Sequence, residues 1–95
     1  MGLRFLWDPR KASANFRKHG VSFDEASTAF ADPLSITIPD PEHSVREERF
    51  ILVGCSVRQR IIVVVHAERS TSDIRLISAR IAGRLERRIY EEDDE

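Results

Sequence analysis

Two runs rich in Ile and Val, residues 49–56 and 60–67, constrain the fold most, because only three residues separate them. Such runs are typical of β-strands, and so short a connection joins antiparallel neighbours. A further strand is predicted at residues 74–79, after a polar turn at residues 68–72, and a shorter one at residues 34–38. The sequence therefore predicts an antiparallel β-meander.

The N-terminal part of the chain predicts a short strand followed by two helices. Residues 5–7 form the strand, and Asp8 followed by Pro9 is typical of a helix start. Gly20 stands where a helix ends in the left-handed conformation. Residues 22–25 have the pattern of a capping box, which begins a second, short helix.

A last helix is predicted to begin between residues 79 and 83. Its apolar stripe consists of Ile81, Leu85 and Ile89. The element order is then β-α-α-β-β-β-β-α. This order predicts a two-layer α+β domain, in which the N-terminal helices and the C-terminal helix pack on one face of the meander. Residues 1–90 form this single domain, and residues 91–95 form an acidic C-terminal tail.

The composition indicates a small cytoplasmic protein. A chain of 95 residues suffices for one compact domain, and its only cysteine, Cys55, excludes an internal disulfide. No targeting segment is recognised in the sequence. The longest uninterrupted apolar run, residues 61–65, is far too short to span a membrane, so we expect no membrane association.

The distribution of charge is more informative than the net charge of −1. All of the last five residues are acidic, and without them fifteen basic residues stand against eleven acidic ones. A basic body can hold phosphates, and an acidic tail can compete with them or move away. The alternative is a solubilising tail on an ordinary surface, and composition does not choose between the two.

The first predicted helix carries one group of candidate site residues. Lys11, Asn15 and Lys18 have the spacing of a polar, cationic stripe, and His19 lies one turn from Asn15. The alternative is a solvated helix face on which Lys18 and His19 complement the helix dipole.

The hairpin formed by residues 60–79 provides a second candidate. If its loop is centred on Ser70 and Thr71, His66 lies opposite Arg75 on one face of the sheet. A histidine beside a guanidinium tends to stay neutral, which suits a general base. A slip of one residue in register would break this pairing, and the alternative is a structural or simply exposed histidine.

The junction between the last strand and the last helix is the third candidate. Arg80, Arg84 and Arg87 have helical spacing, and Arg80 is expected near the helix N-terminus, where backbone N–H groups also favour an anion. An arginine in this position can grip a phosphate with two hydrogen bonds. The alternative is a surface helix in which arginines pair with Glu86.

Several classes of chemistry are not indicated. His19, His43 and His66 lack the spacing of metal ligands, and the four glycines are too scattered for a phosphate loop. Cleavage of RNA without a metal is compatible with the residues present. It needs a base for the 2′-hydroxyl, cations for the phosphate and an acid for the leaving oxygen.

Several motifs together resemble the BrnT family. They are FLWDP at residues 5–9, KHGVSF at 18–23, FADP at 30–33, EERF at 47–50, and ISAR at 77–80 followed by Ala82, Glu86 and Arg87. The likeness runs from about residue 3 to residue 90. It implies a fold like that of the RelE-type ribonuclease toxins, metal-independent and cofactor-free cleavage of RNA, and inhibition of translation.

The resemblance also implies a partner and a set of residues. The partner is a BrnA-type antitoxin with a ribbon-helix-helix domain. The toxin would contact DNA only indirectly, through this antitoxin. Lys18, His19, Arg80 and Glu86 lie within matched motifs and are carried over as catalytic candidates, whereas His66 and Arg75 rest on the hairpin argument. The alternative function is a non-catalytic interaction module that acts as co-repressor with a DNA-binding partner.

Overall fold

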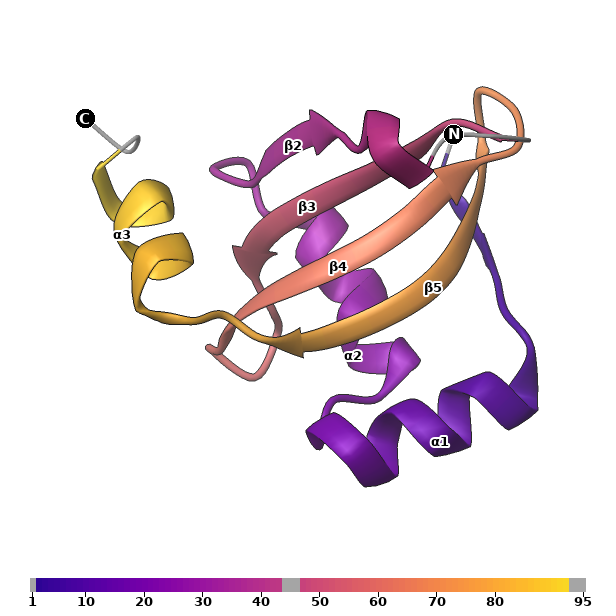
Figure 1. Ribbon diagram of the computed structural model, residues 1–95, viewed down its shortest axis with the longest axis horizontal. Helices are drawn as coiled ribbons and strands as arrows, with labels where there is room; N and C mark the ends of the chain where they lie inside the picture. Colours follow the sequence, from indigo (N-terminus) through magenta and orange to yellow (C-terminus); the bar gives the residue numbers. More distant parts are fainter. Residues whose placement is uncertain (1, 44–46, 93–95) are drawn as a thin grey trace.

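The computed structural model describes residues 2–43 and 47–92. Three helices and five strands follow one another along the chain, with a short 3-10 helix before and after β2 (Figure 1). The elements are β1 (Arg4–Leu6), α1 (Pro9–His19), α2 (Phe23–Thr28), η1 (Ala29–Ala31), β2 (Ile36–Pro39), η2 (Pro41–His43), β3 (Arg49–Cys55), β4 (Ile61–Glu68), β5 (Asp73–Ile81) and α3 (Arg84–Glu92).

The five strands form one mixed sheet in the order β1-β5-β4-β3-β2. Strands β2 to β5 pair with their chain neighbours as an antiparallel meander, as predicted. Strand β1 departs from that prediction, because it adds to the free edge of β5 in the parallel direction. An ion pair between Arg4 and Asp73, with an Nη2–Oδ2 distance of 2.8 Å, accompanies this pairing.

The predicted helix starts are confirmed by the capping groups. Asp8 accepts a hydrogen bond from the Arg10 N–H at 2.8 Å, and Gly20 ends α1 with φ +72°. Ser22 accepts from the Glu25 N–H at 3.0 Å and so caps α2. The second half of the predicted capping box is wrong, because the Glu25 carboxylate binds Ser56 and Arg60 instead.

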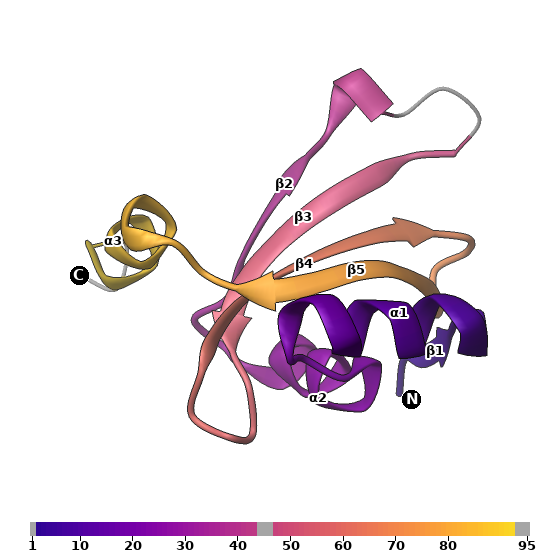
Figure 2. The same ribbon diagram turned by 60° about the horizontal axis from the view of Figure 1, so that its bottom comes forward.

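The core lies between the sheet and α2, while α1 packs beside β5 (Figure 2). On the sheet side it is formed by alternating strand residues, except in β5, where the register shift places the core residues Leu76 and Ala79 three residues apart. The buried cluster consists of Val21, Phe23, Ala26, Ala29, Leu52, Ile62, Val64, Ile74, Leu76 and Ala79.

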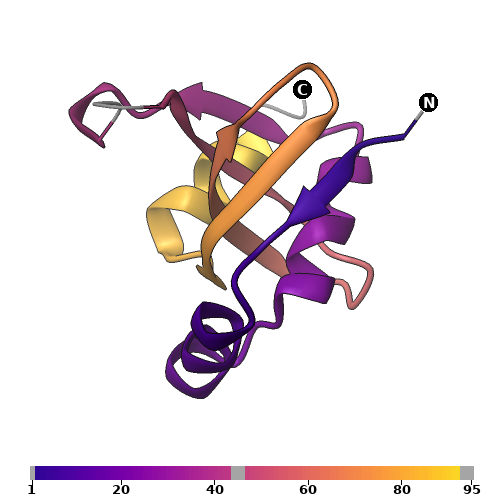
Figure 3. The same ribbon diagram turned by 90° about the vertical axis from the view of Figure 1, so that its right-hand side faces the viewer.

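The prediction that the last helix packs on the same face as the first two is wrong. Figure 3 shows α2 and α3 on opposite sides of the sheet. Leu85 and Ile89 on the predicted apolar stripe are 70% and 57% exposed. The reason is that β5 keeps pairing with β4 as far as Ile81, so the chain leaves the sheet later and α3 continues beyond the strand end.

The predicted acidic tail begins inside α3, which ends at Glu92. Glu91 and Glu92 lie one turn after Arg87 and Arg88, at N–O distances of 3.8 and 3.4 Å. The rest of that tail lies outside the described residues. Among the described helices, none is both long enough and apolar enough to cross a membrane.

Candidate functional site

The sheet has one face that α2 does not cover, and we call it the outer face. Figure 1 looks onto it, with α2 behind the strands and α3 beside their ends. In Figure 2, this face is turned upward, and β2 and β3 extend above β4 and β5, while α2 lies below them. Since Leu52, Val64 and Leu76 point into the core, their chain neighbours present their side chains on the outer face.

Strand register arranges the outer face in rows that cross the sheet. The first row contains two arginines on either side of a small residue: Arg49, Ala67 and Arg75. The next row contains the aliphatic residues Ile38, Ile51 and Val65 and ends in Ser78. The third row ends in another arginine and contains Ile36, Val53, Val63 and Arg80. The face therefore has an aliphatic centre with guanidinium groups at both ends.

The first row is completed by Glu47, which directly precedes β3, and we call Glu47, Arg49 and Arg75 the Glu47 cluster. Arg75 Nη2 forms an ion pair with Glu47 Oε1, and Arg49 Nε lies 3.9 Å from the same oxygen. Ala67, between the two arginines, is fully buried. Arg75 Nε is buried and has no hydrogen-bond partner among the described residues.

At the other end of the outer face, Arg80 binds Glu86 of α3. Two hydrogen bonds join the guanidinium to the carboxylate, Nη1–Oε1 at 2.8 Å and Nη2–Oε2 at 2.6 Å. Glu86 also accepts from the Gly83 N–H at 2.8 Å. The hydrogen bond from Arg80 lowers the pKa of Glu86 against the opposing effect of burial, and it raises the pKa of Arg80.

The prediction that Arg80 shares a helix face with Arg84 and Arg87 is wrong. Arg80 is a residue of β5, and α3 begins only at Arg84. The anion at the start of this helix is the chain's own Glu86 carboxylate. Arg80 thus takes part in the Arg–Glu pairing that was the alternative expectation.

The predicted pairing of His66 with Arg75 is also wrong. An irregularity between Val65 and His66 shifts the register, so His66 lies opposite Leu76 while Arg75 lies opposite Ala67. Neighbouring residues of a strand point to opposite faces, and His66 therefore faces the core, where it is 1% exposed. The register of β4 and β5 is thus shifted by one residue from the predicted one, and this shift separates His66 from Arg75.

His66 sits in an aromatic environment within the core. Its ring centroid lies 4.8 Å from that of Phe30 and 5.7 Å from that of Phe50, which stacks on it. Burial lowers the pKa of His66, and the backbone of Val64 offsets this only in part. The ring is therefore neutral, as expected of a base, but it does not reach the outer face.

Lys18 and His19 lie in the last turn of α1, one turn after Asn15, which binds Ala79 of β5 next to Arg80 in the chain. In the described part of the chain, no hydrogen bond or ion pair joins either of them to Arg75, Arg80 or Glu86. The structure thus pairs only Arg80 and Glu86 among the six predicted site residues.

Asn15 was predicted on a cationic surface stripe, and this is wrong because its side chain is buried. Its Nδ2 donates to the Ala79 carbonyl at 2.8 Å and to the Val21 carbonyl at 3.0 Å. Its Oδ1 accepts from the Ala79 N–H at 3.1 Å. The amide thus pairs with β5 as a neighbouring strand would, beyond the point where β1 ends.

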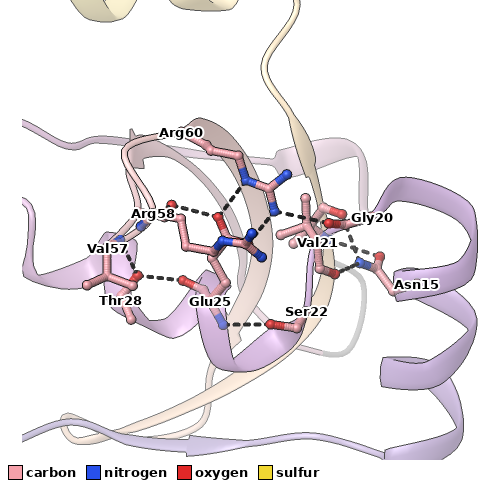
Figure 4. Close-up of polar contacts among 11 residues, drawn as sticks. Asn15, Gly20, Val21, Ser22, Glu25, Thr28, Val57, Arg58 and Arg60 are labelled. Carbon is pink, nitrogen blue, oxygen red and sulfur yellow. Dashed lines mark hydrogen bonds and ion pairs between the residues drawn. The ribbon is translucent and has the colours of Figure 1, made fainter.

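An ion pair of the buried Glu25 carboxylate was not predicted, and Figure 4 shows it near Asn15 and the end of α1. Glu25 Oε2 accepts from Ser56 Oγ at 2.7 Å and from Arg60 Nε at 2.9 Å. Arg60 also donates to the Gly20 carbonyl at 3.0 Å. The hydrogen bond from Arg60 lowers the pKa of Glu25 despite burial. All these groups bind one another, so the network joins α2 to the turn between β3 and β4.

No candidate metal site is present in residues 2–43 and 47–92, the part of the chain that the structure describes. No group of three His, Cys, Asp or Glu side chains within them could hold an ion. The hydroxyl of Tyr90 in α3 donates to Asp32 Oδ2 at 2.5 Å. The ion pairs described on the outer face consist of guanidinium and carboxylate groups.

Sequence reasoning missed Glu47, although it lies in the EERF motif that was singled out. Alternating strand residues could have placed Arg49 and Arg75 on one face, but not beside each other, because their pairing runs through β4. The signal that could have identified Glu47 was its position two residues before Arg49, which places both side chains on the same face of a strand.

Comparison with known proteins adds two findings. A family model described as "Ribonuclease toxin, BrnT, of type II toxin-antitoxin system" matches residues 7–86. The structure is similar to the crystal structure of the Brucella abortus ribonuclease toxin BrnT, with a TM-score of 0.67 and 21% sequence identity. The match covers 86% of this chain and 99% of that chain, and at this identity it shows the fold alone. No curated protein sequence matches the chain.

Proposed function

Because the chain belongs to the BrnT family of ribonuclease toxins of type II toxin–antitoxin systems, we propose that it cleaves RNA on the outer face of its sheet. The observation that carries this proposal is the sheet face that α2 leaves uncovered, with arginines at both ends of an aliphatic centre. Guanidinium groups bind phosphates through two hydrogen bonds, and an aliphatic surface accepts the sugar and base between them.

Arg75 pairs with Ala67 of β4, and Arg80 pairs with Val63, which lies four residues earlier in the same strand. Four strand residues span about 13 Å, so the two arginines address different phosphates of one RNA strand. Lys18 and His19 stay candidates for further contacts with RNA at the edge beside β5. Glu86 is a positioning residue in this proposal, because it holds the Arg80 guanidinium.

The cleavage itself is proposed to need no metal and no cofactor. Arginine can supply the positive charge that a phosphate needs when its negative charge grows in the transition state. The chain is then expected to slow translation in the cytoplasm by removing RNA. The likeness to RelE-type ribonucleases stays a prediction.

The proposed partner is a BrnA-type ribbon-helix-helix antitoxin, and the toxin would meet DNA only through it. The family implies an antitoxin, but its type rests on the motifs of the sequence. The second candidate function, a non-catalytic co-repressor, is favoured by the binding of Arg80 to the chain's own Glu86. Both candidates need the partner, and only the first needs cleavage.

The test is an assay of the purified protein on a labelled single-stranded RNA in EDTA. We expect cleavage by the wild type and a large loss of it in the double variant Arg75→Ala/Arg80→Ala. Arg10→Ala is the matched control, since it removes an exposed arginine at the start of α1. Intact RNA at high protein concentration would favour the co-repressor, and cleavage that requires a divalent metal would overturn the metal-free proposal.

A further inference from the structure

We propose that Glu47 is the general base of RNA cleavage and that Arg49 and Arg75 hold the scissile phosphate beside it. This inference rests on the proposed function and adds the place and chemistry of the reacting atoms. None of the three residues has a role in the Arg80–Glu86 pair at the other end of the outer face.

The position of Glu47 is determined by two strands. Oε1 is bound by Arg75 Nη2 from β5 and lies 3.9 Å from Arg49 Nε of β3. The residue between them on β4 is Ala67, so only a methyl group separates the two arginine side chains. The carboxylate is therefore held from two sides, and the Glu47 side chain is 24% exposed.

The cluster has unused capacity to bind an anion. Arg75 Nε is buried and lacks a hydrogen-bond partner among the described residues, which costs free energy unless a ligand supplies an acceptor. The side chains of Glu47 and Arg75 are only 24% and 25% exposed, so electrostatic attraction there is stronger than on an open surface. A non-bridging phosphate oxygen is an acceptor of suitable charge for this N–H once the guanidinium turns toward the substrate.

The reaction follows from these positions. A carboxylate oxygen of Glu47 takes the proton of the ribose 2′-hydroxyl, and the bond between the 2′-oxygen and phosphorus forms. The bond between phosphorus and the 5′-oxygen breaks, and that oxygen takes a proton from water. The products are a 2′,3′-cyclic phosphate and a 5′-hydroxyl, and Glu47 then returns its proton to solvent.

The two arginines have a separate task in this reaction. When the 2′-oxygen attacks, negative charge grows on the non-bridging phosphate oxygens. Preorganised cations next to those oxygens stabilise the transition state more than the ground state. Arg80, about 13 Å away along the sheet, binds a neighbouring part of the RNA backbone and not the scissile phosphate.

The experiment compares Glu47→Gln with Glu48→Gln, its exposed neighbour in the chain, on a short RNA. Cleavage rates are measured across pH, and binding is measured with the same oligonucleotide carrying a 2′-deoxyribose at the cleaved position. For Glu47→Gln we expect a rate loss of about 10²–10⁴-fold and loss of the acidic limb of the pH profile. Its binding of the deoxy oligonucleotide should stay within about threefold of wild type, and Glu48→Gln should cleave normally.

Other outcomes overturn the inference. Wild-type rate and pH profile in Glu47→Gln exclude a general base at this position, and an equal loss of rate and binding shows positioning only. If Glu47→Gln does not fold, Glu47→Asp decides, because it keeps the charge. We expect it to lose rate but retain the acidic limb, and a wild-type rate would contradict the proposal. RNA left intact by the wild type overturns the proposed function itself and the general base with it.

Discussion

Arg80 at the end of β5 and Glu86 in the first turn of α3 form a two-bond ion pair, with N–O distances of 2.8 and 2.6 Å. Both residues belong to the C-terminal motif and were predicted as catalytic candidates. The pair holds the guanidinium in one orientation at the edge of the outer face. A fixed orientation reduces the entropy that Arg80 loses when it binds a phosphate.

We expect Arg80→Ala to lose toxicity while the protein remains folded. Loss of a charge-assisted hydrogen bond to a neighbouring phosphate weakens RNA binding by about 1.5–3 kcal/mol, or roughly 10–10²-fold. Arg80→Lys should restore only part of this, because an ammonium group cannot form the two-bond fork. Growth inhibition and thermal melting of the same variants check the prediction. Full toxicity with an unchanged melting temperature would remove Arg80 from the site.

The Arg80–Glu86 pair should contribute little to stability. The Arg80 side chain is 44% exposed, and ion pairs of this exposure contribute about 0.2–1 kcal/mol. The coupling is measured by urea unfolding of Arg80→Ala, Glu86→Ala and the double variant. A coupling of several kcal/mol would show that the pair is mainly a structural element of the fold.

His66 should make the protein less stable in mild acid. Its folded-state pKa is lowered by burial, so the unfolded chain binds the proton more readily. The stability is then fully present above the unfolded pKa of about 6.5 and falls below it, by up to about 1.4 kcal/mol per pH unit. Unfolding in urea from pH 8 to pH 5 measures this slope.

His66→Leu provides the comparison for that measurement. The variant removes the titrating group and the buried Nδ1, which has no partner among the described residues. We therefore expect a similar stability at pH 8 and a much weaker dependence on pH below 6.5. An equal slope in both proteins would assign the acid sensitivity to another group.

Asn15→Ala should destabilise the fold strongly. The substitution removes three hydrogen bonds and leaves the N–H and carbonyl of Ala79 without them. We expect a loss of about 2–4 kcal/mol, with a lower melting temperature. Ser13→Ala is the control on the exposed side of α1 and should change stability by less than about 0.5 kcal/mol. Similar melting temperatures of the two variants would contradict this role of Asn15.

Arg60→Ala should also destabilise the fold, because it leaves the buried Glu25 carboxylate without its cation. Removal of one partner of a buried pair costs about 3–5 kcal/mol, and partial exposure of Arg60 reduces this to about 2–3 kcal/mol. The matched control is Arg10→Ala, which removes an exposed arginine outside this network. Equal urea midpoints for the two variants would show that the Glu25–Arg60 pair is not needed.

Local features of the fold could be predicted from the sequence because their causes lie within a few residues. A capping side chain binds an N–H two or three residues away, as Asp8 and Ser22 do. Gly20 adopts a positive φ that other residues avoid. The Ile- and Val-rich runs became β3 and β4 because β-branched side chains suit a pleated, half-buried surface.

The sequence alone thus determined the elements, their order along the chain, the meander of β2 to β5 and the family motifs. Only the tertiary structure decided that β1 pairs with β5 in parallel and that the register shifts at His66. It also decided that α3 leaves Leu85 and Ile89 exposed. It also brought Glu47 to Arg75, 28 residues later in the chain. The physical reason is that register and long-range pairing depend on the packing of the whole sheet, where a shift of one residue moves a side chain to the other face.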